Sequence, residues 1–330
     1  MALTALYEFP ITGTIALPPR GIGLLADGSG VTSYIEDSKL FVVKWTVSGP
    51  IVTQLAERAS SSGLGVSKDG IRVAIVWIES GTRSVRVIDD VFGNRVTHLV
   101  GLAGTSSPGP AIAVGPQGPV ATWVVTGSND APGDGMISIG GLPGVIAIPG
   151  TCINVAPRID ALGTPLLCWR NSISKGNNTV QLQSYAPGAL VYTLGNGADP
   201  ELAVSPYRTS ISGHSGGKVR VWTMPTDLRG VIPYTVGGSA FGHLTESNGV
   251  RLCSMSTWPT PEAAMDKHTN PELRGLCVAA DFGQGWTLTY PFGQGGGLLT
   301  SWGVTLEGDQ AFSVLRTEKF MYGRFWNVRD

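Results

Sequence analysis

The sequence predicts an all-β fold, a seven-bladed β-propeller of four-stranded antiparallel blades. Three observations lead to this prediction: a recurring motif, a regular spacing between its copies, and glycine-rich turns with no helical pattern between them. The motif is an apolar run, a glycine turn and a strand that ends in an aromatic residue. Clear copies are GLGVSKDGIRVAIVW (63–77), AIAVGPQGPVATW (111–123) and APRIDALGTPLLCW (156–169). A period of roughly 40 to 50 residues without helical spacing is typical of propellers.

The turn between the first two strands of each unit sets the number of units. These turns fall near Gly30, Gly70, Gly118, Gly163, Arg208, Gly249 and Gly308. The intervals between them are 40, 48, 45, 45, 41 and 59 residues, which makes seven units. A single domain over residues 1–330 follows, with blades at about 15–57, 58–104, 105–151, 152–197, 198–238, 239–294, and 295–330 plus 4–14. A two-sheet sandwich or two smaller β domains is the alternative.

After the aromatic-ended second strand, each unit continues with further strand-like segments. The third strands are LFVVKW, SVRVID, GMISIG, TVQLQS, KVRVWT, GLCVAA and KFMYGRFW, and several alternate apolar and polar residues as half-buried strands do. The fourth strands are IVTQLA, RVTHLV, GVIAIPG, ALVYTLG, VIPYTV and WTLTYPF. The seventh unit ends after its third strand. ALYEFPI (Ala5 to Ile11) resembles a fourth strand, so we expect the N-terminal segment to complete the last blade and leave neither terminal edge open.

The amino-acid composition agrees with a fold of short strands, and the net charge and hydropathy argue against nucleic acid and membrane as partners. Of 330 residues, 46 are glycine, 22 are proline and 14% are charged, which favours tight turns over helices. A net charge of −1 produces no field that would attract nucleic acid. No apolar stretch approaches the ~18 residues of a membrane span, and the start, MALTALYEFPITG, has no basic or long apolar region of a secretory signal. We therefore expect no nucleic-acid partner, no membrane insertion and no signal peptide.

Closure of the last blade by the N-terminal strand resembles the closure of WD-repeat propellers, and this resemblance covers nearly the whole chain. The DG pairs in VSKDG and LADGSG resemble TolB-type repeats, although the other five units lack them. Low charge, abundant glycine and degenerate repeats resemble the propeller modules of bacteriophage virions, such as tail nozzle or tail-tip proteins. That resemblance implies a structural role in a large assembly.

Two loops are longer than the period requires, and both join second to third strands, on the end of a propeller where binding sites usually gather. VTGSNDAPGDG (Val125 to Gly135) contains the candidate Ca²⁺ ligands Asn129, Asp130 and Asp134, but their spacing departs from an EF-hand, and a solvated turn is the favoured interpretation, so no metal is expected. Residues 256–275 contain the candidate binding residues Trp258, Glu262, Asp266, His268 and Glu272. Trp258 is suited to stacking on a sugar or on a partner chain, and Asp266 with His268 to forming a carboxylate–imidazole pair. A neutral insertion is the alternative.

The cysteines and the repeated tryptophans are interpreted as structural. Cys253 and Cys277 flank the second loop, and buried reduced thiols are expected there over a cross-strand disulfide. Trp77, Trp123 and Trp169 are expected to pack between neighbouring blades. No metal spacing and no cofactor motif is present, so no cofactor is expected.

The sequence favours a non-enzymatic function. Only VSKDGIRVAIVW approaches a sialidase box, and the innermost strands carry few of the carboxylates that glycosidases use. The leading hypothesis is a structural or interaction protein of a larger assembly, whose partners are other proteins or further copies of this chain, located in a virion or else in the cytoplasm. The alternatives are a propeller that binds a surface glycan and a glycoside hydrolase or lyase.

Overall fold

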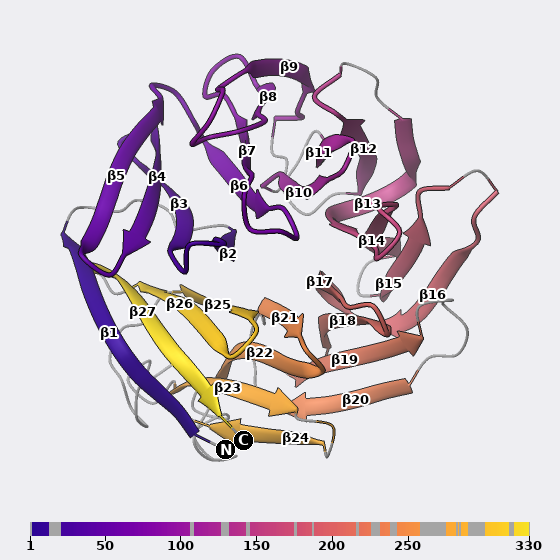
Figure 1. Ribbon diagram of the computed structural model, residues 1–330. Coiled ribbons are helices and arrows are strands. Elements are labelled where there is room, and N and C mark those ends of the chain that lie inside the picture. The colour runs from indigo at the N-terminus through magenta and orange to yellow at the C-terminus, as the bar shows by residue number, and fades with distance from the viewer. Residues whose placement is uncertain are drawn as a thin grey trace, which may run out of the picture.

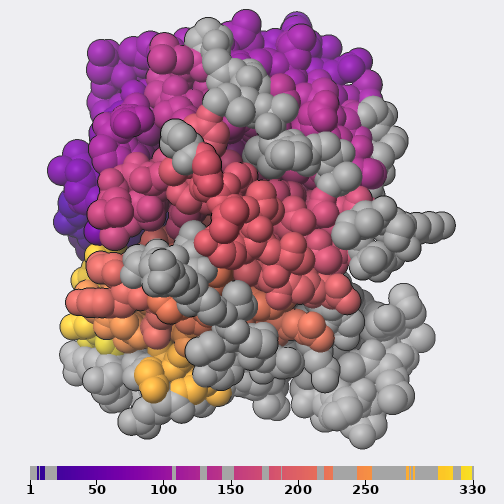
Figure 2. Space-filling view, turned by 90° about the vertical axis from the view of Figure 1, so that its right-hand side faces the viewer, coloured from indigo at the N-terminus to yellow at the C-terminus, as the bar shows by residue number. Residues whose placement is uncertain are grey.

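The chain forms an all-β propeller of small antiparallel sheets around a common centre (Figure 1). The computed structural model describes residues 2–12, 21–105, 109–126, 132–142, 146–174, 177–186, 188–215, 218–225, 232–237, 243–257, 275–281, 283, 285–289, 301–316 and 320–329. No helix occurs among these residues. In Figure 2, which views one side of the molecule, red residues lie between the purple first sheets and the orange and yellow last sheets, as a ring in chain order requires.

The described strands form five four-stranded sheets and one seven-stranded sheet. The first two sheets are β2–β5 (Ile22–Leu24, Gly30–Glu36, Lys39–Thr46, Gly49–Ala56) and β6–β9 (Ser61–Val66, Val73–Ile78, Ser84–Ile88, Thr97–Leu102). The seven-stranded sheet is β10–β16 (Ala111–Gly115, Gly118–Val125, Gly133–Ile139, Ile146–Ile159, Pro165–Ser174, Asn177–Ser184, Val191–Asn196). Next come β17–β20 (Ala198–Val204, Arg208–Ser215, Lys218–Pro225, Ile232–Gly237) and β21–β24 (His243–Ser247, Val250–Thr257, Gly275–Asp281, Trp286–Thr289). The last sheet joins β25–β27 (Ser301–Glu307, Gln310–Arg316, Phe320–Arg329) to β1 (Ala2–Thr12).

Burial follows from the position of a strand in its sheet. The second strand β7, VAIVWI, is buried at every position, because neighbouring sheets cover both of its faces. The fourth strand β5, GPIVTQLA, lies at the outer edge and has no fully buried residue. β-Branched residues suit the crowded inner strands, where they pack on a pleated surface.

The long strand β13 connects two groups of strands that the sequence analysis expected as separate blades. Its first part pairs with β12, with Ile146 opposite Ile137, and its second part pairs with β14, with Ile159 opposite Pro165. β13 is therefore continuous across the predicted boundary between residues 151 and 152. The pairing alone does not separate these two groups into individual sheets, and the predicted blade boundaries stay predictions.

The described residues form seven apolar clusters, and each lies between neighbouring groups of strands. Trp77 packs against β3 and β4, Trp123 against β7 and β8, and Trp169 against β11 and β12. The prediction that these three side chains pack between blades is confirmed. Trp45, Trp222, Trp286 and Trp326 do the same in the other four clusters.

The first strands of the units contact one another around the centre. β2 contacts β6, β6 contacts β10, and the series continues through β13, β17, β21 and β25 back to β2. On one part of this ring the backbones come very close: a Cβ on Gly65 of β6 would lie 2.7 Å from the Ile112 carbonyl oxygen of β10. Only glycine permits that approach.

The N-terminal strand completes the sheet that contains the C-terminal strand, as predicted. β1 pairs with β27 from Ala2 opposite Arg329 to Thr12 opposite Phe320, so the two termini lie side by side (Figure 1). Glu8 of β1 forms an ion pair with Arg324 of β27. Phe9 and Ile11 pack against the cluster around Trp45, which brings residues of β1, β4, β26 and β27 together.

Removal of residues 2–12 should strongly destabilise the propeller. Loss of the burial of Phe9 and Ile11 alone is expected to lower the free energy of unfolding by about 3–5 kcal/mol, in addition to the lost strand pairing. The control is Leu6→Ser on the same strand, whose side chain is 50% exposed and which should change stability by less than about 0.5 kcal/mol. Urea unfolding of both variants tests this, and equal stability of truncated and intact chains would contradict it.

Gly323→Ala should destabilise the interface between β27 and the β2–β5 sheet. A Cβ on Gly323 would lie 2.5 Å from the Trp45 indole, and overpacking of this kind costs about 1–3 kcal/mol. Trp45→Leu removes the obstructing ring, so the double variant should lose less stability than the sum of the two single variants. Additive losses in urea unfolding would argue against direct packing of these two residues.

Candidate functional site

Most of the candidate site residues in the two predicted loops lie outside the described residues. They are Asn129 and Asp130 of the first loop, and Trp258, Glu262, Asp266, His268 and Glu272 of the second. Asp134 is described: it is exposed on β12, opposite Val125. In the described part of the chain no three His, Cys, Asp or Glu side chains come together as a metal site.

The cysteines are placed by strand register and burial. In the β22–β23 ladder, Cys253 lies opposite Ala279 and Cys277 opposite Met255, so the two cysteines are not direct partners. Burial raises the pKa of Cys152 to about 12 and raises that of Cys168 well above its ordinary value. These two thiols are therefore protonated and unreactive at neutral pH.

A central pocket of about 430 Å³ is enclosed by the innermost strands and by the turns that follow them. Its lining comes from residues 22–26, 64–70, 112–114, 158–161, 202–206, 244–248 and 305–307. The lining includes turn residues such as Lys68, Asp160 and Ser205, so the pocket lies toward one end of the propeller. We call that end the turn face: it carries the turns between first and second strands and between third and fourth strands.

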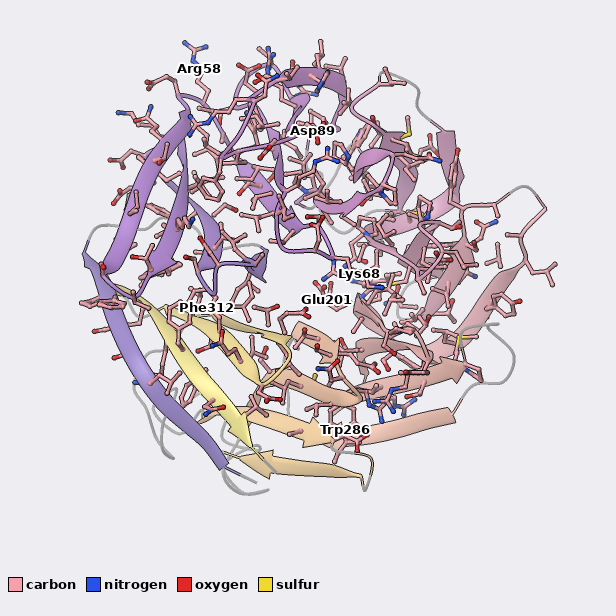
Figure 3. The ribbon with its side chains drawn as sticks, viewed as in Figure 1. Arg58, Lys68, Asp89, Glu201, Trp286 and Phe312 are labelled. Atoms are coloured by element: carbon pink, nitrogen blue, oxygen red, sulfur yellow. The ribbon has the colours of Figure 1, made fainter. Side chains whose placement is uncertain are left out.

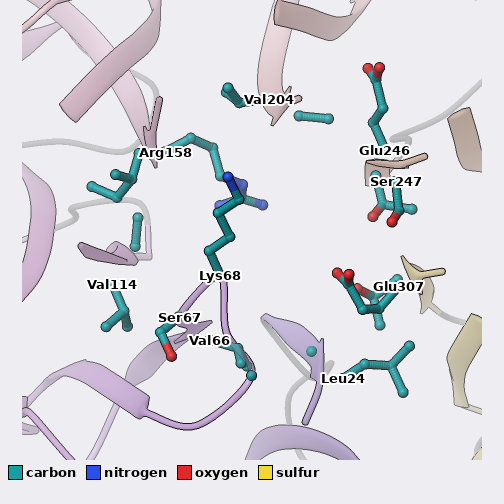
Figure 4. Close-up of a pocket in the computed structure, with 18 of the residues that line it drawn as sticks. Leu24, Val66, Ser67, Lys68, Val114, Arg158, Val204, Glu246, Ser247 and Glu307 are labelled. Carbon is teal, nitrogen blue, oxygen red and sulfur yellow. The ribbon is translucent and has the colours of Figure 1, made fainter. Parts of the chain in front are cut away.

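Two basic side chains point into this pocket from different sheets. Lys68 comes from the turn after β6, and Arg158 comes from the inner part of β13; both extend toward the middle of the pocket in Figure 4. Figure 3 shows Lys68 and Glu201 near the centre of the ring. Arg158 Nη2 lies 3.9 Å from Glu201 Oε2, a loose ion pair.

Three of the acidic side chains that line the pocket are held by neighbouring groups. Glu246 accepts hydrogen bonds from Arg208 Nε at 2.6 Å and from Ser210 Oγ at 3.2 Å. Asp160 accepts from the backbone amides of its own turn, and Asp69 accepts from the Ser67 hydroxyl. These carboxylates therefore stabilise turns and sheet contacts.

Glu307 differs from the other lining carboxylates because it faces the pocket at the end of β25. Desolvation by the pocket walls raises the pKa of Glu307, and the positive charge of Lys68 opposes that rise. The pocket thus has basic groups on Lys68 and Arg158 and an acidic group on Glu307, and Figure 4 shows Glu307 across from the two basic residues.

A polar network connects the β17–β20 and β21–β24 sheets beside the pocket. Arg251 and Asp281 form a buried ion pair, with Nε 3.1 Å from Oδ2, and the Arg251 guanidinium lies 4.8 Å from the Trp286 ring centroid. Burial alone would raise the pKa of Asp281, but the hydrogen bonds from Arg251 and from the Gly283 and Gly285 amides outweigh it and lower the pKa. Arg251 also reaches Ser210 Oγ of β18 at 3.4 Å, so this interface combines apolar packing with charge.

Large apolar side chains stand exposed at the turn tips of the turn face. Their exposed fractions range from 39% to 90%. They are Val47, Ile71, Phe92, Leu142, Leu162, Leu190 and Tyr207, which we call the turn-tip residues. Such positions favour Gly, Asn, Asp or Ser, and an exposed group of apolar residues often marks an interaction surface.

The sequence analysis placed its candidate binding residues at the other end of the propeller from the pocket and the turn-tip residues, and those candidates stay a prediction. The predicted loops join second to third strands, whereas the pocket mouth and the turn-tip residues belong to the opposite connections. A signal was present: Leu162 in DALGT and Tyr207 in SPYRT occupy turn positions where a bulky apolar side chain is unexpected. The placement of Lys68 and Arg158 in the same pocket had no signal in the sequence, because 90 residues separate them.

Comparison with known proteins identifies the fold alone. No protein family matches the chain, and no curated protein is similar to it in sequence. The structure resembles the β-propeller domain of the Trilobed protease from Pyrococcus furiosus, with a TM-score of 0.54, 10% identity, and coverage of 99% of this chain and 97% of that one. It also resembles the polysaccharide lyase Uly1, with a TM-score of 0.56, 9% identity, and coverage of 98% and 92%.

TolB from Acinetobacter baumannii is a more distant match. Its TM-score is 0.48 at 16% identity, and the match covers 67% of this chain and 55% of TolB. At that level it carries no argument about the DG-containing repeats. The Pyrococcus domain is described as having an open velcro topology, whereas here β1 pairs with β27. Among the described residues, no helix has the length and apolar character to cross a membrane.

Asp281→Asn should destabilise the chain by about 3–5 kcal/mol, because Arg251 is then buried without its counter-charge. The matched control is the double variant Arg251→Met with Asp281→Leu, which removes both charges and should cost less. Since the folded-state pKa of Asp281 is lowered, its contribution is complete above the unfolded pKa of about 3.9 and is lost as pH falls through the lower folded value. Urea unfolding should therefore give a constant difference from wild type above about pH 5 and a shrinking one below about pH 4. A difference that instead grows on acidification would contradict this assignment.

Proposed function

We propose that this chain is a non-enzymatic, seven-bladed propeller that docks other proteins on its turn face, as a component of a larger assembly. The observation that carries this proposal is the set of exposed turn-tip residues on the face where the pocket opens, of which Ile71, Leu162 and Tyr207 directly follow pocket-lining residues in the chain. A turn tip gains nothing for the fold from a bulky apolar side chain in water. Burial against a partner would recover roughly 1.5–3 kcal/mol for each such side chain.

The number of blades is an inference from packing. Seven stretches of chain line the pocket, and the described residues form seven clusters between groups of strands. β13 supplies the outer strand of one blade and the inner strand of the next, so the seven-stranded sheet counts as two blades. This count supports the sequence period of about 45 residues.

The outer strands support a place within a larger assembly. β5, β9, β16, β20 and β24 contain no Asp, Glu, Lys or Arg. Exposed edge strands usually carry charges that discourage further pairing. Together with 14% charged residues and a mean hydropathy of +0.14, these uncharged edges favour a chain with neighbours around its rim. A virion or phage-tail component is the assembly we propose, on composition and architecture.

Catalysis and glycan binding are less well supported. A glycoside hydrolase needs two carboxylates that face one substrate, and Glu246 and Asp160 are already engaged by Arg208 and by turn amides. The polysaccharide lyase and the protease among the similar structures share only the fold. No Trp, Tyr or Phe lines the pocket in the described part of the chain, so a stacking platform for a sugar is not found there.

The docking proposal is tested with Leu162→Asp combined with Tyr207→Asp. These side chains are 90% and 77% exposed, so the fold should be unaffected while docking is lost. We expect at least about a tenfold drop in the fraction that co-migrates with high-mass particles from the native source. The readout is size-exclusion with light scattering, followed by electron microscopy of the particle fraction.

The matched control is Val125→Asp at the end of β11, at the opposite end of the propeller from the turn face and away from the outer strands, where the side chain is 37% exposed. The control should retain the assembly. A strict monomer without any partner would overturn the proposal, as would a control that loses as much assembly as the turn-face variant.

A further inference from the structure

The central pocket opens on the turn face, where we propose that other proteins dock. The pocket is also large enough to bind a small ligand. Its volume of about 430 Å³ falls within the range of roughly 300–1,000 Å³ that is usual for such sites. Aliphatic side chains form much of its wall, among them Leu24, Val66, Val114 and Val204 (Figure 4). A ligand that fills the pocket therefore needs an apolar body.

The polar groups in the pocket select the charge of that ligand. Lys68 forms no ion pair or hydrogen bond with a described residue, and its side chain extends toward the pocket centre. Among the described residues, Arg158 contacts the Pro157 carbonyl at 3.1 Å and forms the loose pair with Glu201, and these contacts leave several of its N–H donors available. A lysine and an arginine that line one pocket from two different sheets are suited to a carboxylate.

The acidic residues limit the ligand to a single negative charge. Glu307 lies across the pocket from Lys68, and Glu246 lies nearby in its pair with Arg208 (Figure 4). A dianion such as phosphate would meet both of these carboxylates, whereas one carboxylate placed on Lys68 and Arg158 avoids most of the repulsion. Glu307 then repels the bound carboxylate and lowers its affinity while ionised.

We propose that the pocket binds a single carboxylate on an aliphatic body, with the carboxylate on Lys68 and Arg158 and the body against the aliphatic wall. A free aliphatic carboxylic acid and a peptide that ends in an aliphatic residue share this chemistry. The site goes beyond the docking role of the surrounding face, because it uses different residues and needs no docked partner.

Calorimetry of the full chain at pH 7 and low salt tests the site with four probes. These are hexanoate, hexanamide, and a short peptide ending in leucine with either a free or an amidated C-terminus. We expect the ionised probes to bind and the neutral ones to bind at least about tenfold more weakly, since the charge-assisted hydrogen bonds are lost. Binding of hexanoate alone identifies a free acid as the ligand, and binding of the free peptide alone identifies a chain terminus.

Three variants test which residues of the pocket bind the ligand. Lys68→Gln should weaken binding of the ionised probe by about 10- to 100-fold, and Glu307→Gln should strengthen it several-fold, because it removes a repelling charge. Lys39→Gln, at an exposed lysine that begins β4 at the opposite end of the propeller, should leave binding of the ionised probe unchanged. Lys68 is exposed at the pocket mouth, so an unchanged unfolding curve is expected for its variant.

The proposal is overturned if no probe binds, if the amidated peptide and hexanamide bind as tightly as the ionised probes, or if Lys68→Gln binds like wild type. Such a failure leaves docking untouched, since docking is tested at Leu162 and Tyr207. Conversely, the Leu162 and Tyr207 double variant should bind the ionised probe normally, which separates the two functions.

Discussion

Antiparallel pairing of β1 with β27 is the contact on which the propeller depends. Each sheet packs only on its two neighbours, so an open ring would leave two large apolar faces in water. The pairing places Phe9 and Ile11 beside the Trp45 cluster, which the first and last sheets share. With the ring closed, each sheet has a neighbour on both sides. Every cluster that contains a tryptophan is then covered by a second group of strands. The contacts among the innermost strands follow from that cycle.

The interfaces between sheets determine how rigidly the turns are held. Most combine a tryptophan with small or aliphatic neighbours, as with Trp123, whose ring lies where a Cβ on Gly101 would be. The interface between β17–β20 and β21–β24 also contains the buried Arg251–Asp281 pair. The free-energy cost of removing these two charges from water is offset only while both residues are present. This interface therefore tolerates replacement of a single one of these side chains poorly. Turns that extend from such a frame present their side chains in defined directions.

The pocket and the exposed turn-tip residues that support the proposed functions lie on the turn face for geometric reasons. The innermost strands converge there on one pocket, so that Lys68, Arg158 and Glu307 face a shared space from three sheets. The exposed turn-tip residues lie on the same face, and three of the acidic residues that line the pocket are engaged in hydrogen bonds within the fold. An apolar surface with a small charged pocket at its centre is suited to recognition. It is poorly suited to a reaction that needs two unengaged carboxylates.

The sequence by itself determined the local structure: the strand pattern, the glycine turns, the structural role of Trp77, Trp123 and Trp169, and the completing strand near Ala5 to Ile11. These follow from a two-residue period and from turn chemistry, both of which act over a few neighbouring residues. Only the tertiary structure decided that β13 runs unbroken through residues 151 and 152, that Arg251 pairs with Asp281, and that Lys68 and Arg158 line the same pocket. Those encounters depend on the curvature of the closed ring and on the packing of whole sheets, and no local pattern of residues encodes them.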